Sequence, residues 1–203
     1  MNQLTRAARK EQTRALLLRT AYEVFSEHGI AGTRVSDVAT AAGVAQGTVF
    51  VHFASQEALV EAVIGEFGAR IALRTHELTT SRGTLEATLR AHLDGIAEFE
   101  PFYTRLVIEN RLLPQAARDA LIEIQSAISF HFGQVIAREP AAAGIPSHLL
   151  FNTWIGLVHH YLANGDLFAP EGRVIERHGA SLIDTYLRLV DPSRRTTEKE
   201  ETP

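Results

Sequence analysis

The sequence predicts an all-α protein that consists of a small N-terminal unit and a larger helical body. Apolar residues recur at helical spacing through most of the 203 residues, and the alternation with a period of two that indicates a half-buried β-strand is missing. Glycine and proline interrupt this pattern between the predicted helices. The predicted domains are residues 1–55 and 56–190. The tail, 191–203, is charged with almost no apolar side chains, so we expect it to be disordered.

Four helices are predicted in the first part of the chain, and their approximate ranges are 11–28, 35–42, 46–52 and 56–80. Gly29 can end the first helix and Gly43 the second, because glycine readily adopts the backbone conformation that follows a helix. Thr33 is the expected N-cap of the second helix, and Ser55 that of the fourth.

The remainder should fold into further helices, with approximate ranges 84–99, 101–113, 114–138, 147–164 and 171–190. Pro101 and Pro114 fit the first turn of a helix, where the missing N–H costs nothing. Pro140, Gly144 and Pro146 indicate one loop, and the segment 165–172 indicates another.

Composition excludes several classes of protein. The absence of cysteine excludes disulfides, thiolate chemistry and cysteine-ligated zinc. No apolar stretch reaches the roughly 18 residues of a membrane-spanning helix, and the N-terminus lacks the apolar segment of a signal peptide. We therefore expect a cytoplasmic protein. Motifs for a nucleophile elbow, a zinc protease, a P-loop or a dinucleotide site are also missing, which argues against an enzyme.

Charge is divided unevenly along the chain. Residues 1–55 carry six basic and four acidic residues, and the remainder carries 14 basic and 20 acidic residues. A basic N-terminal part on an acidic body indicates one surface that faces a polyanion. The alternative is a disordered, solvated N-terminus.

The stretch from Asp37 to Phe53 has the pattern of a helix-turn-helix. Gly43 permits the left-handed backbone of a tight turn, and small residues beside it allow two helices to cross closely. In the third helix Val49 and Phe53 should point inward. Its first residues are small and polar, which suits a recognition helix that enters the major groove of DNA. A helical hairpin without a role in DNA binding is the alternative.

Residues 14–64 resemble the DNA-binding domain of the tetracycline-repressor (TetR) family. The shared pattern is R-x-x-LL-x-x-A-x-x-x-F-x-x-x-G followed by T-x-V-x-DVA-x-AAGVA-x-GTVF-x-HF-x-x-x-E-x-L. The resemblance implies a homodimeric transcription regulator, usually a repressor that a small ligand releases from a palindromic operator in double-stranded DNA. It also implies the following DNA-binding residues: Arg34, Ser36, Gln46, Gly47, Thr48, Phe50, Val51, His52 and Gln56.

Three positions depart from the family pattern. Ala45 stands where serine commonly caps the recognition helix, Phe50 where tyrosine often donates to a phosphate, and Gln56 where lysine is frequent. Fewer charged contacts should give a shallower salt dependence of DNA affinity. These departures from the family pattern also motivate an alternative function, a protein-interaction module on a TetR-like scaffold with weakened or lost DNA binding. His52 is expected either at a phosphate or packed within the domain.

The helical body is expected to form a cavity for a hydrophobic or aromatic effector, because apolar walls with a few polar groups are typical of small-molecule sites. The candidate ligand-binding residues are Phe99, Phe102, Tyr103, Arg105, His131, Trp154 and His159. Most aromatic residues of the body should simply form its core. Arg105 and Glu109 are four residues apart, so a surface ion pair is the simplest role for Arg105, and an anchor for an anionic ligand is the alternative.

The last two long helices should form the dimer interface, as the resemblance implies. The candidate residues are Leu150, Leu157, Tyr161, Leu182, Tyr186 and Leu189. An internal core without dimerisation is the alternative. No cofactor is expected. No metal site is expected either, because the histidines of the body show no pair at the spacing of three or four residues that brings two ligands together on a helix.

Overall fold

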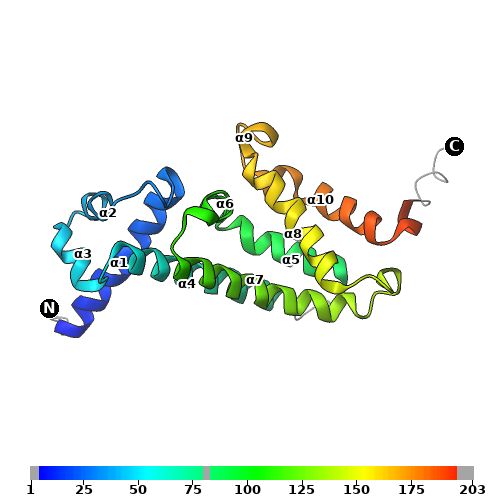
Figure 1. Cartoon of the computed structure of the whole chain (residues 1–203), viewed down its shortest axis with the longest axis horizontal. Coiled ribbons are helices and arrows are strands. Elements are labelled where there is room, and N and C mark those ends of the chain that lie inside the picture. The colour runs from blue at the N-terminus through cyan, green and yellow to red at the C-terminus, as the bar shows by residue number, and fades with distance from the viewer. Residues whose placement is uncertain (1–4, 80–82, 196–203) are drawn as a thin grey trace. The chain divides into compact units, whose positions relative to one another are not determined.

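A computed structural model describes residues 5–79 and 83–195 of the chain, and it confirms the prediction of an all-α fold (Figure 1). The helices are α1 Arg6–His28, α2 Val35–Ala41, α3 Gln46–His52, α4 Gln56–Thr79, α5 Leu85–Ala97, α6 Glu100–Glu109, α7 Gln115–Ile136, α8 Ser147–Ala163, α9 Gly165–Phe168 and α10 Val174–Val190. Short 3-10 turns cover Asn110–Leu112, Pro140–Ala142 and Pro192–Arg195. In the described part of the chain, no helix is long and apolar enough to cross a membrane.

The chain forms two compact units. The first comprises Met1–Ala69 and Pro101–Glu123, and the second comprises Arg70–Glu100 and Ile124–Pro203. The division falls inside α4, α6 and α7, whereas the sequence pattern placed a boundary at residue 55. Domains read from the sequence follow the chain, but compact units follow contacts between distant segments. The predicted domain boundaries therefore stay a prediction.

In the first unit, α1 begins five residues earlier than the sequence pattern indicates. Thr5 caps it, because its hydroxyl accepts a hydrogen bond from the Ala8 N–H at 3.2 Å. The basic residues near the N-terminus, from Arg6 onward, are therefore helical rather than a disordered arm. Residues 1–4 lie outside the described part. The helix ends as expected at Gly29, whose φ of +89° is in the left-handed region.

A tight turn connects α2 and α3, and α2 packs against both α1 and α3 (Figure 1). The Gly43 N–H donates to the Thr40 carbonyl at 3.1 Å and the Val44 N–H to the Ala39 carbonyl at 3.0 Å. Gly43 has a φ of +67°, and a Cβ at this position would meet no atom within 4 Å. The backbone conformation of the turn, and not crowding, therefore requires glycine.

The N-cap predicted for α2 is wrong. Arg34 occupies the cap position, where its backbone N–H donates to the Asp37 carboxylate at 2.8 Å. The Thr33 hydroxyl instead donates to the Gly29 carbonyl. Ser55 caps α4 as predicted, because its hydroxyl accepts from the Ala58 N–H at 3.1 Å.

The core of the first unit holds these helices together through apolar and aromatic side chains. The rings of Tyr22 on α1 and Phe67 on α4 are stacked with centroids 3.9 Å apart, and the Phe102 ring of α6 lies 5.1 Å from Tyr22. Arg14 places its guanidinium 5.5 Å from the centroid of the Phe53 ring. This cation–π contact ties the residue that follows α3 to α1.

In the second unit α10 packs against α5 and α8. Buried residues recur along one face of α10, and the hydroxyl of Tyr186 on this face donates to the Leu150 carbonyl of α8 at 2.7 Å. No side chain of its own caps α10. The buried Glu100 carboxylate does so instead, because it accepts from the N–H groups of Val174 at 2.6 Å and Ile175 at 3.2 Å.

Several boundaries in the body differ from prediction. The α6 helix ends at Glu109 and continues as a 3-10 turn, and a short helix, α9, lies in the segment 165–172 that was expected to be a loop. Pro192–Arg195 form a 3-10 turn in which the Asp191 carboxylate accepts from the Ser193 N–H at 3.0 Å, where disorder was expected. The rest of the predicted tail, 196–203, lies outside the described residues.

Candidate nucleic-acid interface

The α3 helix presents a mixed polar and apolar face to solvent. Val49 and Phe53 are buried as predicted, so they fix the orientation of the helix. Gln46 and Gly47 are exposed, Phe50 is 46% exposed and Val51 is 70% exposed. Thr48 and His52 are half-buried. Solvent-facing Phe and Val beside one another cost hydration free energy, so this face is a candidate for contact with another molecule.

His52 packs partly within the domain, which is one of the two alternatives, and its contact with a phosphate stays a prediction. Its Nδ1 atom is buried and has no hydrogen-bond partner among the described residues, while the residue as a whole is only half-buried. Its ring centroid lies 6.5 Å from that of Phe53. The ring therefore packs against the domain along one edge.

At the start of α2, the Arg34 side chain is exposed and forms no ion pair among the described contacts. Ser36 is half-buried, and its hydroxyl lies 3.4 Å from the Asp37 carboxylate, a long hydrogen bond. Both side chains thus remain candidates for phosphate contacts.

Gln56 has a role that the sequence did not reveal. Its side-chain amide donates to the Thr33 carbonyl at 2.9 Å, and the residue is half-buried. The first residue of α4 thus holds the loop that leads into α2. Its expected contact with DNA stays a prediction.

The same loop is held on another side by α6. The Glu109 carboxylate accepts from the N–H groups of Ile30 at 2.9 Å and Ala31 at 2.6 Å. A Cβ on Gly29 would lie 2.6 Å from a Glu109 carboxylate oxygen, so a larger residue here would displace this carboxylate. Hydrogen bonds to a carboxylate are stronger than those between neutral groups, so Glu109 fixes the entry into the helix-turn-helix.

Arg105 acts beside Glu109 on the same helix. Its guanidinium donates to the carbonyls of Ser26 at 3.4 Å and Glu27 at 2.9 Å, at the end of α1. A cation there satisfies carbonyls that have no partner within the helix. Among the described contacts, Arg105 and Glu109 thus bind α1 and its loop, and the surface ion pair expected between them is not formed.

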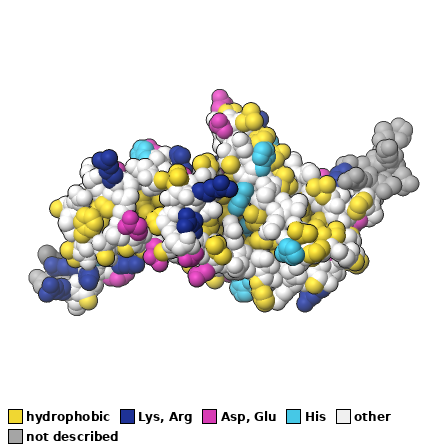
Figure 2. All heavy atoms as spheres, viewed as in Figure 1, with side chains coloured by type: hydrophobic (Ala, Val, Ile, Leu, Met, Phe, Trp, Pro, Cys, Tyr) yellow, Lys and Arg dark blue, Asp and Glu magenta, His cyan; other side chains and the backbone are white. Residues whose placement is uncertain are grey.

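A basic surface lies at the start of the chain. Arg6, Arg9 and Lys10 are exposed on the first turns of α1. Figure 2 shows dark blue side chains gathered around this end of the chain. Positive charge on the unit that carries α3 suits a polyanionic partner.

The predicted effector residues fall into both units. Phe102, Tyr103 and Arg105 belong to the first unit, where the two aromatic rings are buried in its core. Phe99, His131, Trp154 and His159 belong to the second unit, where Phe99 and Trp154 are buried and the two histidines are half-buried. Their role in ligand binding stays a prediction.

Trp154 is part of a buried polar cluster that spans α5, α8 and α10. Its indole N–H donates to Nδ1 of His92 at 3.0 Å, and its ring lies edge-to-face against Tyr186 with centroids 5.3 Å apart. Burial lowers the pKa of His92 to about 3, and the neighbouring His159 imidazole lowers it as well. Burial also lowers the pKa of His159 to about 4 and raises that of Tyr186. At neutral pH all of these side chains are therefore uncharged.

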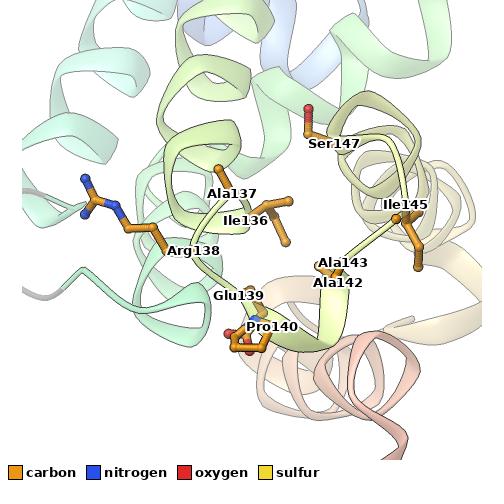
Figure 3. Close-up of a pocket in the computed structure, with 10 residues that line it drawn as sticks. Ile136, Ala137, Arg138, Glu139, Pro140, Ala142, Ala143, Ile145 and Ser147 are labelled. Carbon is orange, nitrogen blue, oxygen red and sulfur yellow. The ribbon is translucent and has the colours of Figure 1, made fainter.

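Elsewhere, described residues line two cavities. One, of about 450 Å³, follows the turn Ile136–Ser147 between α7 and α8, and Arg138 extends away from this turn (Figure 3). The other, of about 470 Å³, lies in the first unit between α1 and α2, with Val24 and Thr40 among its lining residues. Neither is lined by a predicted effector residue.

The predicted dimer residues differ widely in exposure. Leu150, Leu182 and Tyr186 are buried within the chain itself. Tyr161 is half-buried, and its ring stacks on Phe168 of α9 at 4.3 Å. Leu157 is half-buried and Leu189 is 54% exposed. Of the six, Leu189 keeps the most surface for a partner.

Two histidines from separate helices meet in the second unit. His76 Nδ1 and His131 Nε2 lie 2.9 Å apart, and burial together with the His76 charge lowers the pKa of His131. Within residues 5–79 and 83–195, no three histidine or carboxylate side chains gather to hold a metal ion.

Comparison with known proteins agrees with this architecture. Residues 17–63 match the family described as "Bacterial regulatory proteins, tetR family". The transcriptional activator FasR of Mycolicibacterium smegmatis is 28% identical over 179 residues, which are 84% of this chain and 78% of FasR. The repressor KstR2 of Rhodococcus jostii is 33% identical over 91 residues, which are 43% of this chain and only 45% of KstR2.

Solved structures extend the likeness in fold beyond the N-terminal segment. FadR of Bacillus subtilis, solved in complex with stearoyl-CoA, superposes with a TM-score of 0.70 and 18% identity over 85% of this chain and 96% of FadR. The chain belongs to the TetR family of helix-turn-helix transcriptional regulators, which bind DNA.

Proposed function

We propose that the chain is a homodimeric repressor that a small hydrophobic or aromatic effector releases from a palindromic operator. The observation that carries this proposal is the α3 region, in which Phe50 and Val51 face solvent while the side chains of Val49 and Phe53 are buried in the domain. A rigid helix with an exposed mixed face can enter the major groove, where Gln46 can bond to a base edge and the apolar pair can contact thymine methyl groups.

The backbone contacts of this interface would come from the surroundings of α3. We propose that Arg34, Ser36 and Thr48 contact phosphates, and that the exposed basic residues of α1 add attraction to the duplex. His52 can present only the ring edge that is not buried in the domain. Gln56 supports the interface chiefly by holding the Thr33 carbonyl.

We propose dimerisation through the exposed sides of α8 and α10. Leu157 and Leu189 contribute apolar surface there, and Gly156 and Ala180 are exposed small residues that permit two helices to approach closely. A two-fold interface suits a palindrome, because it places two recognition helices about one DNA turn apart, roughly 34–36 Å.

Effector binding is proposed for the second unit, around Trp154 and His159. An effector lowers operator affinity only to the extent that it binds the DNA-free arrangement better than the DNA-bound one.

The experiment is a selection from random DNA duplexes at two salt concentrations, followed by sequencing of the retained fraction. The expected result is a palindrome whose retention falls as salt rises. Val51→Asp should abolish the selection, because a carboxylate would face the groove. Leu112→Asp is the matched control, since Leu112 is 71% exposed and Val51 70%.

Two results would contradict the proposal. A folded, dimeric protein that selects no sequence would favour the interaction module, with Phe50 and Val51 as its contact surface. Equal loss of selection in the two aspartate variants would show that the effect is not local to α3. For the interface, Leu189→Arg should yield monomers in sedimentation analysis, while Leu112→Arg leaves the dimer intact.

A further inference from the structure

The His92–Trp154 hydrogen bond fixes the tautomer of a buried imidazole. An indole nitrogen is only a donor, so Nδ1 of His92 must accept with its lone pair. The ring is uncharged, and its single proton therefore lies on Nε2. The geometry of one hydrogen bond thus identifies a second, oriented N–H donor on the other side of the ring.

This second donor has no hydrogen-bond partner among the described residues. His92 is 1% exposed, and its Nε2 atom is buried. A buried donor without an acceptor costs about 1–3 kcal/mol relative to a paired one. Such groups are rare in folded proteins and call for a physical explanation. A leucine or phenylalanine would fill a core position on α5 without this cost.

The imidazole that carries the donor belongs to an aromatic and uncharged cluster. Trp154 and Tyr186 supply ring surfaces, and Phe132 lies next to Tyr186 with centroids 6.5 Å apart. The Tyr186 hydroxyl is already bonded to the Leu150 carbonyl. His159 is the ionisable group whose charge acts on His92. No lysine or arginine of the described residues acts on His92, so a carboxylate buried beside it would be an unpaired charge, and burial of an unpaired charge is costly.

We infer that the Nε2–H of His92 is the hydrogen-bond donor for the effector, and that the effector is an uncharged, mainly apolar molecule with a carbonyl oxygen. The inference rests on the effector-responsive function proposed above and specifies its ligand class. The one polar atom of the ligand satisfies the donor on the side of the imidazole away from Trp154, and its apolar body lies in the apolar core of the second unit. The Trp154 N–H orients the imidazole, so Trp154 is a positioning residue.

The test compares pairs of molecules that differ only in a carbonyl group. Acetophenone with ethylbenzene, and benzophenone with diphenylmethane, are suitable probes because the oxygen replaces two hydrogens with little change in shape. Binding to the DNA-free protein is followed by NMR. Two signals are diagnostic: the Nε2–H of His92 in protein with ¹⁵N-labelled histidine, and the indole N–H of Trp154, the single tryptophan of the chain.

His92→Phe keeps an aromatic ring and removes the donor. The ratio of ketone to hydrocarbon affinity should fall by about 2- to 10-fold in this variant, which corresponds to one neutral hydrogen bond. Comparing ratios cancels the greater hydrophobicity of the hydrocarbons. His160→Phe is the matched control, because His160 is exposed on the same helix as Trp154 and its loss should leave the ratio unchanged.

In wild-type protein the ketone should shift the His92 Nε2–H signal and the hydrocarbon should leave it nearly unchanged, a result that does not depend on the variant folding. The inference is overturned if neither pair binds or if the affinity ratio is the same in wild type and His92→Phe. It is also overturned if the Nε2–H of His92 stays hydrogen-bonded to a water molecule when the ketone is bound. Because no DNA is used, failure here leaves the operator selection unaffected. If the operator selection yields no palindrome, the proposed repressor is refuted, but a measured preference for ketones over hydrocarbons would stand.

Discussion

The buried His92 should make the stability of the second unit depend on pH. In the unfolded chain this imidazole has its ordinary pKa of 6.5, whereas burial lowers its pKa in the folded protein to about 3. Between these values the unfolded state binds a proton that the folded state does not, so stability falls as the pH falls. The contribution is fully present above the unfolded pKa and is lost progressively toward pH 3.

The magnitude follows from these two pKa values. On lowering the pH from about 7 to about 5, His92 alone should reduce the free energy of unfolding by about 2 kcal/mol. His159 acts in the same direction, because burial lowers its pKa to about 4. A comparison between two proteins that both contain His159 therefore isolates the part due to His92.

The assay is urea unfolding at a series of pH values, followed by the fluorescence of Trp154, which lies beside His92 and is the only tryptophan. His92→Phe will be less stable at neutral pH, because the indole N–H loses its acceptor, but it should lose about 2 kcal/mol less than wild type between pH 7 and pH 5. His160→Phe should follow wild type. Parallel pH profiles for wild type and His92→Phe would refute the assignment of a buried, neutral His92.

Three further substitutions test individual contacts. Gly43→Ala should destabilise the first unit by about 1–2 kcal/mol, because alanine must adopt a positive φ. Gly32→Ala is the control and should be neutral or slightly stabilising, because Gly32 has no positive φ and free space around it. Thermal unfolding of the two variants distinguishes these outcomes. Glu109→Ala removes the acceptor of two backbone N–H groups and should lower the free energy of chemical unfolding by about 2 kcal/mol. It should also lower the affinity for the operator. Unchanged affinity would mean that the loop does not position α3. Glu100→Gln should cost about 1–3 kcal/mol in urea unfolding, because an amide presents one acceptor oxygen to two donors, while the exposed Glu98→Gln serves as control.

The sequence was most informative where neighbours along the chain decide the structure. The inward positions Val49 and Phe53, the glycine turn at Gly43 and the cap at Ser55 all depend on helical spacing or on local hydrogen bonds, and the structure confirms them. Helix boundaries also depend on hydrogen bonds that residue type alone does not predict. Thr33 has the residue type of a cap, but its hydroxyl bonds back to Gly29, and Arg34 takes the cap position.

The contacts that support the candidate sites come from residues far apart in sequence. Glu109 binds a loop 79 residues away, Glu100 caps a helix 74 residues away, and His92 accepts from a tryptophan 62 residues away. No local pattern distinguishes such a glutamate or histidine from a solvated one. For the same reason Gln56 was assigned to DNA alone, although its amide holds Thr33.

By itself the sequence determined the class of fold, the position of the helix-turn-helix and the residues that α3 presents, because helical periodicity, turn chemistry and a long shared motif are all written along the chain. Only the tertiary structure decided which polar groups are buried, which partners they have and therefore which are charged. Burial and pairing depend on the helices that surround a residue. The oriented donor of His92, on which the proposed ligand class rests, is one of these features.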